Sequence, residues 1–136
     1  MSAGAFGRAS GVQPCACGSG ATYDACCGPL HRGEAVAETA EALMRSRYAA
    51  FALDLSDYLM ATWHPRTRPA TIELDTALEW VRLEVLDTTG GGRGDSEGEV
   101  EFTAHHREDG RRGHLHERSR FVRRGGRWFY LDGVVG

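Results

Sequence analysis

Apolar residues between positions 33 and 52 recur at steps of three and four, the period of an amphipathic helix. Thr39 is a suitable N-cap for this helix, since its hydroxyl can accept from a free backbone N–H of the first turn. A shorter helix is predicted over 57–63, with Ser56 as its cap and His64-Pro65 at its end. The buried stripe of the first helix would contain Leu43, Met44, Tyr48 and Phe51.

From Trp80 onward the apolar period changes to two, which indicates β-strands. The glycine-rich segment 90–98 predicts a hairpin loop, and Asp109-Gly110 and Gly125-Gly126 predict tight turns of the primed type. Together these turns divide the rest of the chain into four antiparallel strands. In the first strand, Val81, Leu83 and Val85 alternate with Arg82 and Glu84.

Two-residue turns fix the register of the strands that they connect. The first turn would place Ala104 opposite Leu115 and Phe102 opposite Glu117, and the second would place Phe121 opposite Tyr130 and Ser119 opposite Asp132. One face of the sheet is then apolar and would be covered by the helices. We therefore expect an α+β fold in which helices pack on a curved antiparallel sheet and enclose a conical pocket. The apolar face would carry Val100, Phe102, Ala104, Leu115, Phe121, Trp128 and Tyr130, with Glu117, Ser119 and Asp132 among them.

Two carboxylates are predicted on this apolar face, where an unpaired charge is costly. Glu117 and Asp132 would therefore either pair with Arg45 or Arg47 of the first helix or have a functional role. In the functional interpretation, burial raises the pKa of a carboxylate, which can then act as a general base. His64 is a third catalytic candidate because histidine titrates near neutral pH. The pocket wall would contain Tyr48, Trp63, Phe102, Ser119, Phe121, Trp128 and Tyr130.

All four cysteines of the chain lie within thirteen residues, in a C-x-C-x8-C-C pattern. Four thiolates in such a compact segment suit a tetrahedral ion, and the glycines that follow allow tight turns around it. The alternative is a pair of disulfides, although adjacent cysteines would strain a mutual bridge. We expect zinc, with iron as the alternative metal. The predicted ligands are Cys15, Cys17, Cys26 and Cys27.

The segment from Cys15 to Gly28 resembles the SEC-C motif, C-x-C-G-S-G-x-x-Y-x-x-C-[CH]-G, which is named for the C-terminus of the translocation motor SecA. Every fixed position of the motif is filled. The motif usually ends in Cys-His, whereas this chain has Cys-Cys, so the resemblance implies Cys27 as the fourth ligand. His31 is a substitute ligand to be considered.

Four further segments extend the resemblance to nearly the whole chain, which looks like the YchJ-type family of bacterial proteins. That resemblance implies a SEC-C motif on a cone-shaped domain similar to nuclear transport factor two, ketosteroid isomerase and the SnoaL cyclases. It implies no particular reaction. The segments are Thr-Ala-Glu-Ala-Leu-Met-Arg-Ser-Arg-Tyr (39–48), Thr-Trp-His-Pro (62–65), His-Glu-Arg-Ser-Arg-Phe (116–121) and Trp-Phe-Tyr-Leu-Asp-Gly (128–133).

Composition narrows the classes of partner. A formal net charge of −3 over 136 residues gives no strong indication of nucleic-acid binding. The chain has no long apolar run that predicts a membrane span and no signal-peptide core, so we expect a cytoplasmic protein whose thiols stay reduced. The expected organisation is a flexible leader (1–13), the metal-binding knuckle (14–30) and the cone domain (33–136).

Two functions are compatible with these observations. In the first, the knuckle binds metal and serves as a docking or structural module for a macromolecular partner, as SEC-C motifs do in other proteins. In the second, the cone is a small-molecule-binding protein or an enzyme with isomerase-like or dehydratase-like acid–base chemistry, which would use Glu117, Ser119 and Asp132. An open pocket that holds an unpaired carboxylate would favour the second function.

Overall fold

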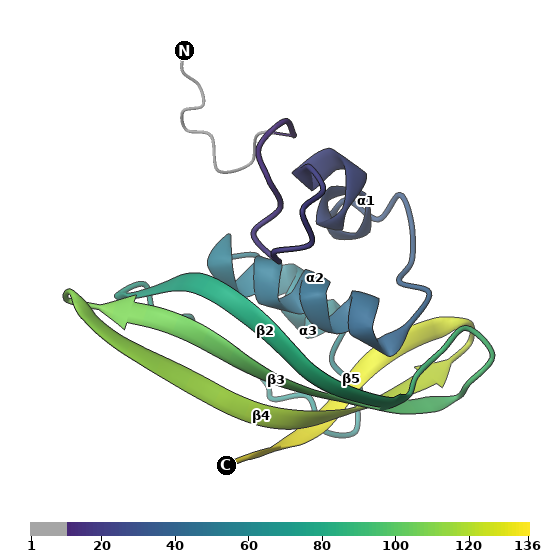
Figure 1. Cartoon of the computed structure of the whole chain (residues 1–136). Coiled ribbons are helices and arrows are strands. Elements are labelled where there is room, and N and C mark those ends of the chain that lie inside the picture. The colour runs from purple at the N-terminus through teal and green to yellow at the C-terminus, as the bar shows by residue number, and fades with distance from the viewer. Residues whose placement is uncertain (1–10) are drawn as a thin grey trace.

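A curved sheet of four antiparallel strands is the largest element of the computed structural model, which describes residues 11–136. Neighbouring strands follow one another in the sequence, so each pair is joined by a hairpin. Figure 1 shows that the sheet curves around the helices on one side, as expected for an α+β fold. The strands are β2 (Leu78–Gly90), β3 (Glu97–Glu108), β4 (Arg111–Arg124) and β5 (Arg127–Val135).

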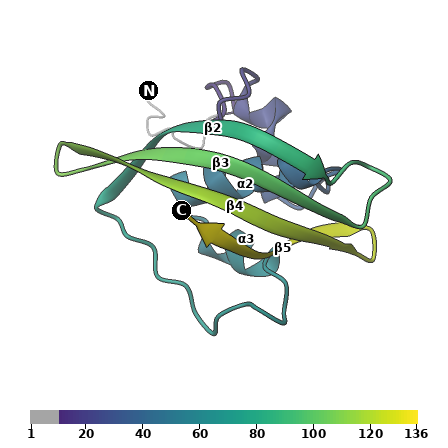
Figure 2. The same ribbon diagram turned by 60° about the horizontal axis from the view of Figure 1, so that its bottom comes forward.

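Helix α2 (Ala40–Ala52) lies across the concave side of the sheet, and α3 (Ser56–Ala61) packs against α2 (Figures 1 and 2). The predicted cap of α2 is confirmed, because the hydroxyl of Thr39 accepts a hydrogen bond of 3.0 Å from the backbone N–H of Ala42. The predicted cap of α3 is wrong: the helix begins at Ser56, and its cap, Leu55, makes no side-chain hydrogen bond. No helix in residues 11–136 is both long and apolar enough to cross a membrane.

The third layer is the cysteine segment, which packs on the side of α2 away from the sheet (Figure 1). It contains the 3-10 turn η2 (Tyr23–Ala25) and the short helix α1 (Cys27–His31). The predicted leader lies outside the described residues except for 11–13. These three residues are held against the knuckle, because the backbone N–H of Tyr23 donates a hydrogen bond to the carbonyl of Gln13.

The register of β3 and β4 agrees with the prediction. Ala104 lies opposite Leu115, and Phe102 lies opposite Glu117. A two-residue turn at Asp109-Gly110, in which both residues have positive φ, accounts for this pairing.

The predicted register of β4 and β5 holds only as far as Phe121, which does face Tyr130. Beyond that pair, β5 carries one extra residue, Leu131, so that Asp132 lies opposite Arg120 instead of Ser119. The prediction that Asp132 faces the interior is therefore wrong.

Contacts outside the sheet explain this bulge. The backbone of Tyr130 bonds to the segment after α3, because its N–H donates to Thr62 and its carbonyl accepts from His64. The hydroxyl of Thr67 also donates to the carbonyl of Leu131. The alternation of residues within β5 cannot predict these contacts, because the segment that makes them lies 60 or more residues away in the chain.

Two glycines bring the start of α2 close to the sheet. Gly98 lies opposite Gly90 at the base of the β2–β3 hairpin and close to the backbone of Gly91, whose carbonyl accepts from the N–H of Ala40. A Cβ on Gly98 would lie 2.7 Å from the nitrogen of Gly91 and 3.2 Å from the Cβ of Ala40. Backbone atoms on the facing strand cannot move aside as a flexible side chain can.

We predict that Gly98→Ala lowers the free energy of unfolding by about 2 kcal/mol, the usual cost of overpacking a closely packed site. Gly94→Ala is the matched control, because no atom lies within 4 Å of its added Cβ and its φ is not positive. Urea denaturation of both variants measures the difference. Equal midpoints would show that the Gly91–Gly98 contact does not constrain the fold.

Candidate functional site

The four cysteine sulfurs gather at one point of the knuckle. Each Sγ lies within 4.8 Å of the other three, and all four cysteines are free thiols. The Sγ of Cys17 lies 3.5 Å from that of Cys26, which lies 3.9 Å from that of Cys27. Tetrahedral zinc at about 2.3 Å from each thiolate requires sulfur pairs about 3.8 Å apart, so the cluster could hold such an ion.

The backbone around the cluster turns where the sequence has glycine. Gly18 and Gly20 have φ values of +80° and +92°, a region that residues with a Cβ rarely adopt. The N–H of Cys15 donates a hydrogen bond to the carbonyl of Ala21, which closes the loop that contains both glycines. Hydrogen bonds from neighbouring thiols, Cys15 first, lower the pKa of Cys17 well below that of a free cysteine.

His31 is an anchor of the knuckle, and both of its ring nitrogens are occupied. Its Nδ1 lies 2.6 Å from the hydroxyl of Tyr23, and its Nε2 lies 2.8 Å from the carbonyl oxygen of Ser46 in α2. Burial lowers the pKa of His31, which favours the neutral ring, in which one nitrogen donates and the other accepts. The geometry therefore does not support His31 as a substitute ligand.

Arg45 makes a second connection between α2 and the knuckle. Its Nη1 donates to the carbonyl of Cys17 at 2.9 Å, and its Nε donates to Glu41 at 3.0 Å. The side chain thus points away from the sheet, so the predicted pairing of Arg45 with Glu117 or Asp132 is wrong.

A cavity of about 260 Å³ lies between α2 and the concave face of the sheet. Seven aromatic side chains and three aliphatic ones form most of its wall, and Arg47, Glu117 and Ser119 are the polar groups. Of the predicted pocket residues, six line this cavity: Tyr48, Trp63, Phe102, Ser119, Phe121 and Tyr130. Five further residues line the cavity but were not among the predicted pocket residues: Met44, Phe51, Trp80, Ala104 and Leu115.

Glu117 is held by two hydroxyl groups of the sheet. Ser119 and Tyr130 donate to its Oε2 at 2.6 and 3.1 Å. Within residues 11–136, no arginine, lysine or histidine makes an ion pair with Glu117, so the predicted pairing is absent there. Gly133 lies opposite Ser119, and a Cβ at Gly133 would lie 2.7 Å from the carboxyl carbon of Glu117. The absence of a side chain at Gly133 therefore leaves space for the carboxylate of Glu117.

Arg47 is the second charged group of the cavity, and it is only 6% exposed. Its Nη1 donates to the carbonyl of Leu59 and to the hydroxyl of Thr62. The guanidinium also lies over two aromatic rings, 5.2 Å from the centre of Trp63 and 4.6 Å from that of Tyr130. Burial lowers the pKa of Arg47 to about 10, so the group is still a cation at neutral pH.

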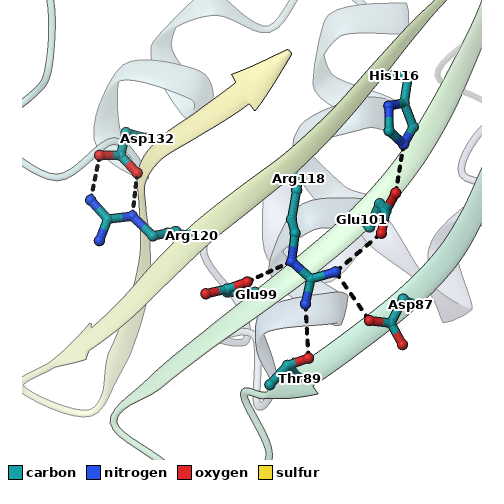
Figure 3. Close-up of polar contacts among 8 residues, drawn as sticks. All are labelled: Asp87, Thr89, Glu99, Glu101, His116, Arg118, Arg120 and Asp132. Carbon is teal, nitrogen blue, oxygen red and sulfur yellow. Dashed lines mark hydrogen bonds and ion pairs between the residues drawn. The ribbon is translucent and has the colours of Figure 1, made fainter. Parts of the chain in front are cut away.

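Asp132 lies on the opposite face of the sheet, outside the cavity. Both of its oxygens accept from Arg120, at 2.7 and 2.6 Å, and these hydrogen bonds lower the pKa of Asp132 (Figure 3). On the same face Arg118 contacts Glu99, Glu101 and Asp87 (Figure 3). This outer face is thus covered by an ion-pair network.

His64 and Trp128 do not line the cavity either. The Nδ1 of His64 accepts a hydrogen bond from the N–H of Arg66 at 3.0 Å. The His64 ring packs against Phe129, so it lies beside β5 and outside the cavity. The indole N–H of Trp128 donates to the carbonyl of Glu38, before α2. Of the three catalytic candidates, only Glu117 reaches the cavity.

Comparisons with solved structures show the same arrangement in two other proteins. A SEC-C motif containing protein from Rhodopseudomonas palustris superposes with a TM-score of 0.79 at 41% identity, covering 90% of this chain and 98% of that one. One from Psychrobacter arcticus superposes with a TM-score of 0.76 at 28% identity, covering 93% and 84%.

Sequence comparisons agree with the structural ones. A UPF0225 protein of Streptomyces coelicolor is 52% identical over 122 residues, which span 90% of this chain and 95% of the relative. Another from Methylibium petroleiphilum is 54% identical, over 90% and 88% of the two chains.

Family models identify both parts of the molecule. The SEC-C motif model matches residues 13–29, around the sulfur cluster. The model described as "YchJ, middle NTF2-like domain" matches residues 39–133, which include α2, α3 and nearly all of the sheet. The chain is therefore a member of the YchJ family, also named UPF0225, in which a SEC-C motif precedes a domain similar to nuclear transport factor two.

Proposed function

We propose that the protein binds one zinc ion through Cys15, Cys17, Cys26 and Cys27, and that the metal-bound knuckle is a docking module for a macromolecular partner in the cytoplasm. The observation that supports the metal site is the gathering of four free thiols within 4.8 Å of one another. Zinc suits a closed site of four thiolates, because it needs no open coordination position in a structural role. Iron is the alternative for the same ligands.

The knuckle has an inner and an outer side. The inner side contacts α2 through His31 and Cys17. Ala16, Ser19 and Thr22 of the knuckle are exposed to solvent, and we take these residues as its outer side. Because a bound metal fixes this loop, the outer side would present a rigid surface, which lowers the entropy cost of binding a partner.

Our first test of this proposal is the metal content of the purified protein. Elemental analysis should find about one equivalent of zinc per chain, since four thiolates in one place fold around one ion. Cys27→Ser should lose most of this metal, whereas His31→Gln should keep it, because His31 bonds to Tyr23 and Ser46 instead.

Three results would contradict the assignment. They are a protein without metal, a protein with two disulfides by mass spectrometry, and a metal content that depends on His31 but not on Cys27.

The second test concerns docking. Ala16→Arg places an arginine on the exposed outer side of the knuckle without replacing a cysteine ligand. Thr71→Arg is the matched control, because it places an arginine on an exposed loop of the cone. In affinity capture from lysate with metal-loaded protein, a partner of the knuckle should be lost with Ala16→Arg and retained with Thr71→Arg. A set of captured proteins that is the same for wild type and both variants would count against a docking role.

A further inference from the structure

We propose that the cavity beneath α2 is a binding site for a neutral, planar aromatic compound whose hydroxyl or N–H group donates a hydrogen bond to Glu117. This site is separate from the proposed zinc site, because none of the four cysteines lines the cavity. It would give the cone a function that does not depend on docking by the knuckle.

The wall of the cavity determines the shape of the ligand. Several of its rings meet edge to face, such as Trp63 with Tyr130 at 84° and Tyr48 with Trp80 at 69°. A flat aromatic ring that enters a wall built largely of aromatic side chains can pair with them in offset-stacked or edge-to-face contacts, which favours a planar aromatic ligand. A volume of about 260 Å³ lies just below the usual range for small-molecule sites, so we infer a ligand of one or two fused rings.

Glu117 determines which polar group the ligand must carry. The donors Ser119 and Tyr130 both bond to Oε2 and so fix the orientation of the carboxylate. Within residues 11–136, no hydrogen bond reaches Oε1, which is therefore available as an acceptor. A ligand that lacked a donor would cover this oxygen without pairing it, and an unpaired buried acceptor is costly.

Charge balance determines that the ligand is neutral. Arg47 and Glu117 are the only charged side chains among the residues that line the cavity, and their charges offset each other. The two groups interact electrostatically, since Glu117 stabilises the protonated form of Arg47. An ionic ligand would lose its hydration in this apolar space without gaining a counter-charge of its own.

Two naphthalene derivatives test this proposal by isothermal titration calorimetry. 2-Naphthol has a hydroxyl donor, and 2-methoxynaphthalene has nearly the same shape but no donor. The wild-type protein should bind 2-naphthol at least about tenfold more tightly, because a hydrogen bond to a charged acceptor contributes that much or more. This comparison requires no variant, so it does not depend on the folding of any mutant.

Glu117→Gln then assigns the donor preference to one residue. The hydroxyls of Ser119 and Tyr130 should hold the amide oxygen of the glutamine, so that its NH2 group, which cannot accept, takes the place of Oε1. The variant should then bind both probes with affinities within about twofold of each other. Asp132→Asn is the matched control, because it removes a carboxylate from the opposite face of the same sheet and should keep the preference.

The proposal is overturned if the wild type binds neither probe or does not distinguish them. It is also overturned if Glu117→Gln retains the preference for 2-naphthol, or if Asp132→Asn abolishes it. Metal content is measured on the same samples, so a failed zinc assignment and a failed cavity assignment are recognised separately.

Discussion

Helix α2 is the element on which both sites of this protein depend, because it is packed on two sides. Its outer side holds the knuckle through Arg45 and through the carbonyl of Ser46. Its inner side supplies Met44, Arg47 and Tyr48 to the cavity. A shift of the helix by one residue would rotate each side chain by about 100° about the helix axis and would break both sets of contacts. The contacts with the knuckle and those with the cavity therefore fix the same position of α2. Each site therefore helps to position the helix for the other.

Much of this arrangement could be predicted from local patterns in the sequence. The helical period identified Leu43, Met44 and Tyr48 as buried residues of α2, although Phe51 is only half-buried. The Asp109-Gly110 turn gave the correct pairing of Phe102 with Glu117. The spacing of the cysteines and glycines identified the sulfur cluster as a candidate metal site. Each of these features depends on residues that are close in the sequence, or on a turn whose geometry the residue types determine.

The features that could not be predicted depend on distant contacts. The bulge at Leu131 placed Asp132 on the outer face, and a similar irregularity near Val81 left that side chain 45% exposed. Arg47 was expected to pair with a carboxylate but instead bonds to Leu59 and Thr62 and lies over two rings. At Leu131 and at Arg47, the partners come from α3 and the segment after it, which no alternation pattern contains.

The most direct test of this two-sided role of α2 is hydrogen–deuterium exchange with and without a chelator of the proposed metal. If the knuckle binds that metal and supports α2, chelation should increase exchange in residues 14–31 and in the central turns of α2 around Arg45 and Ser46. The amides of β3 and β4 should stay protected, because the sheet has its own core around Val100 and Phe121. Unchanged exchange in α2, or loss of protection throughout the sheet, would contradict this account.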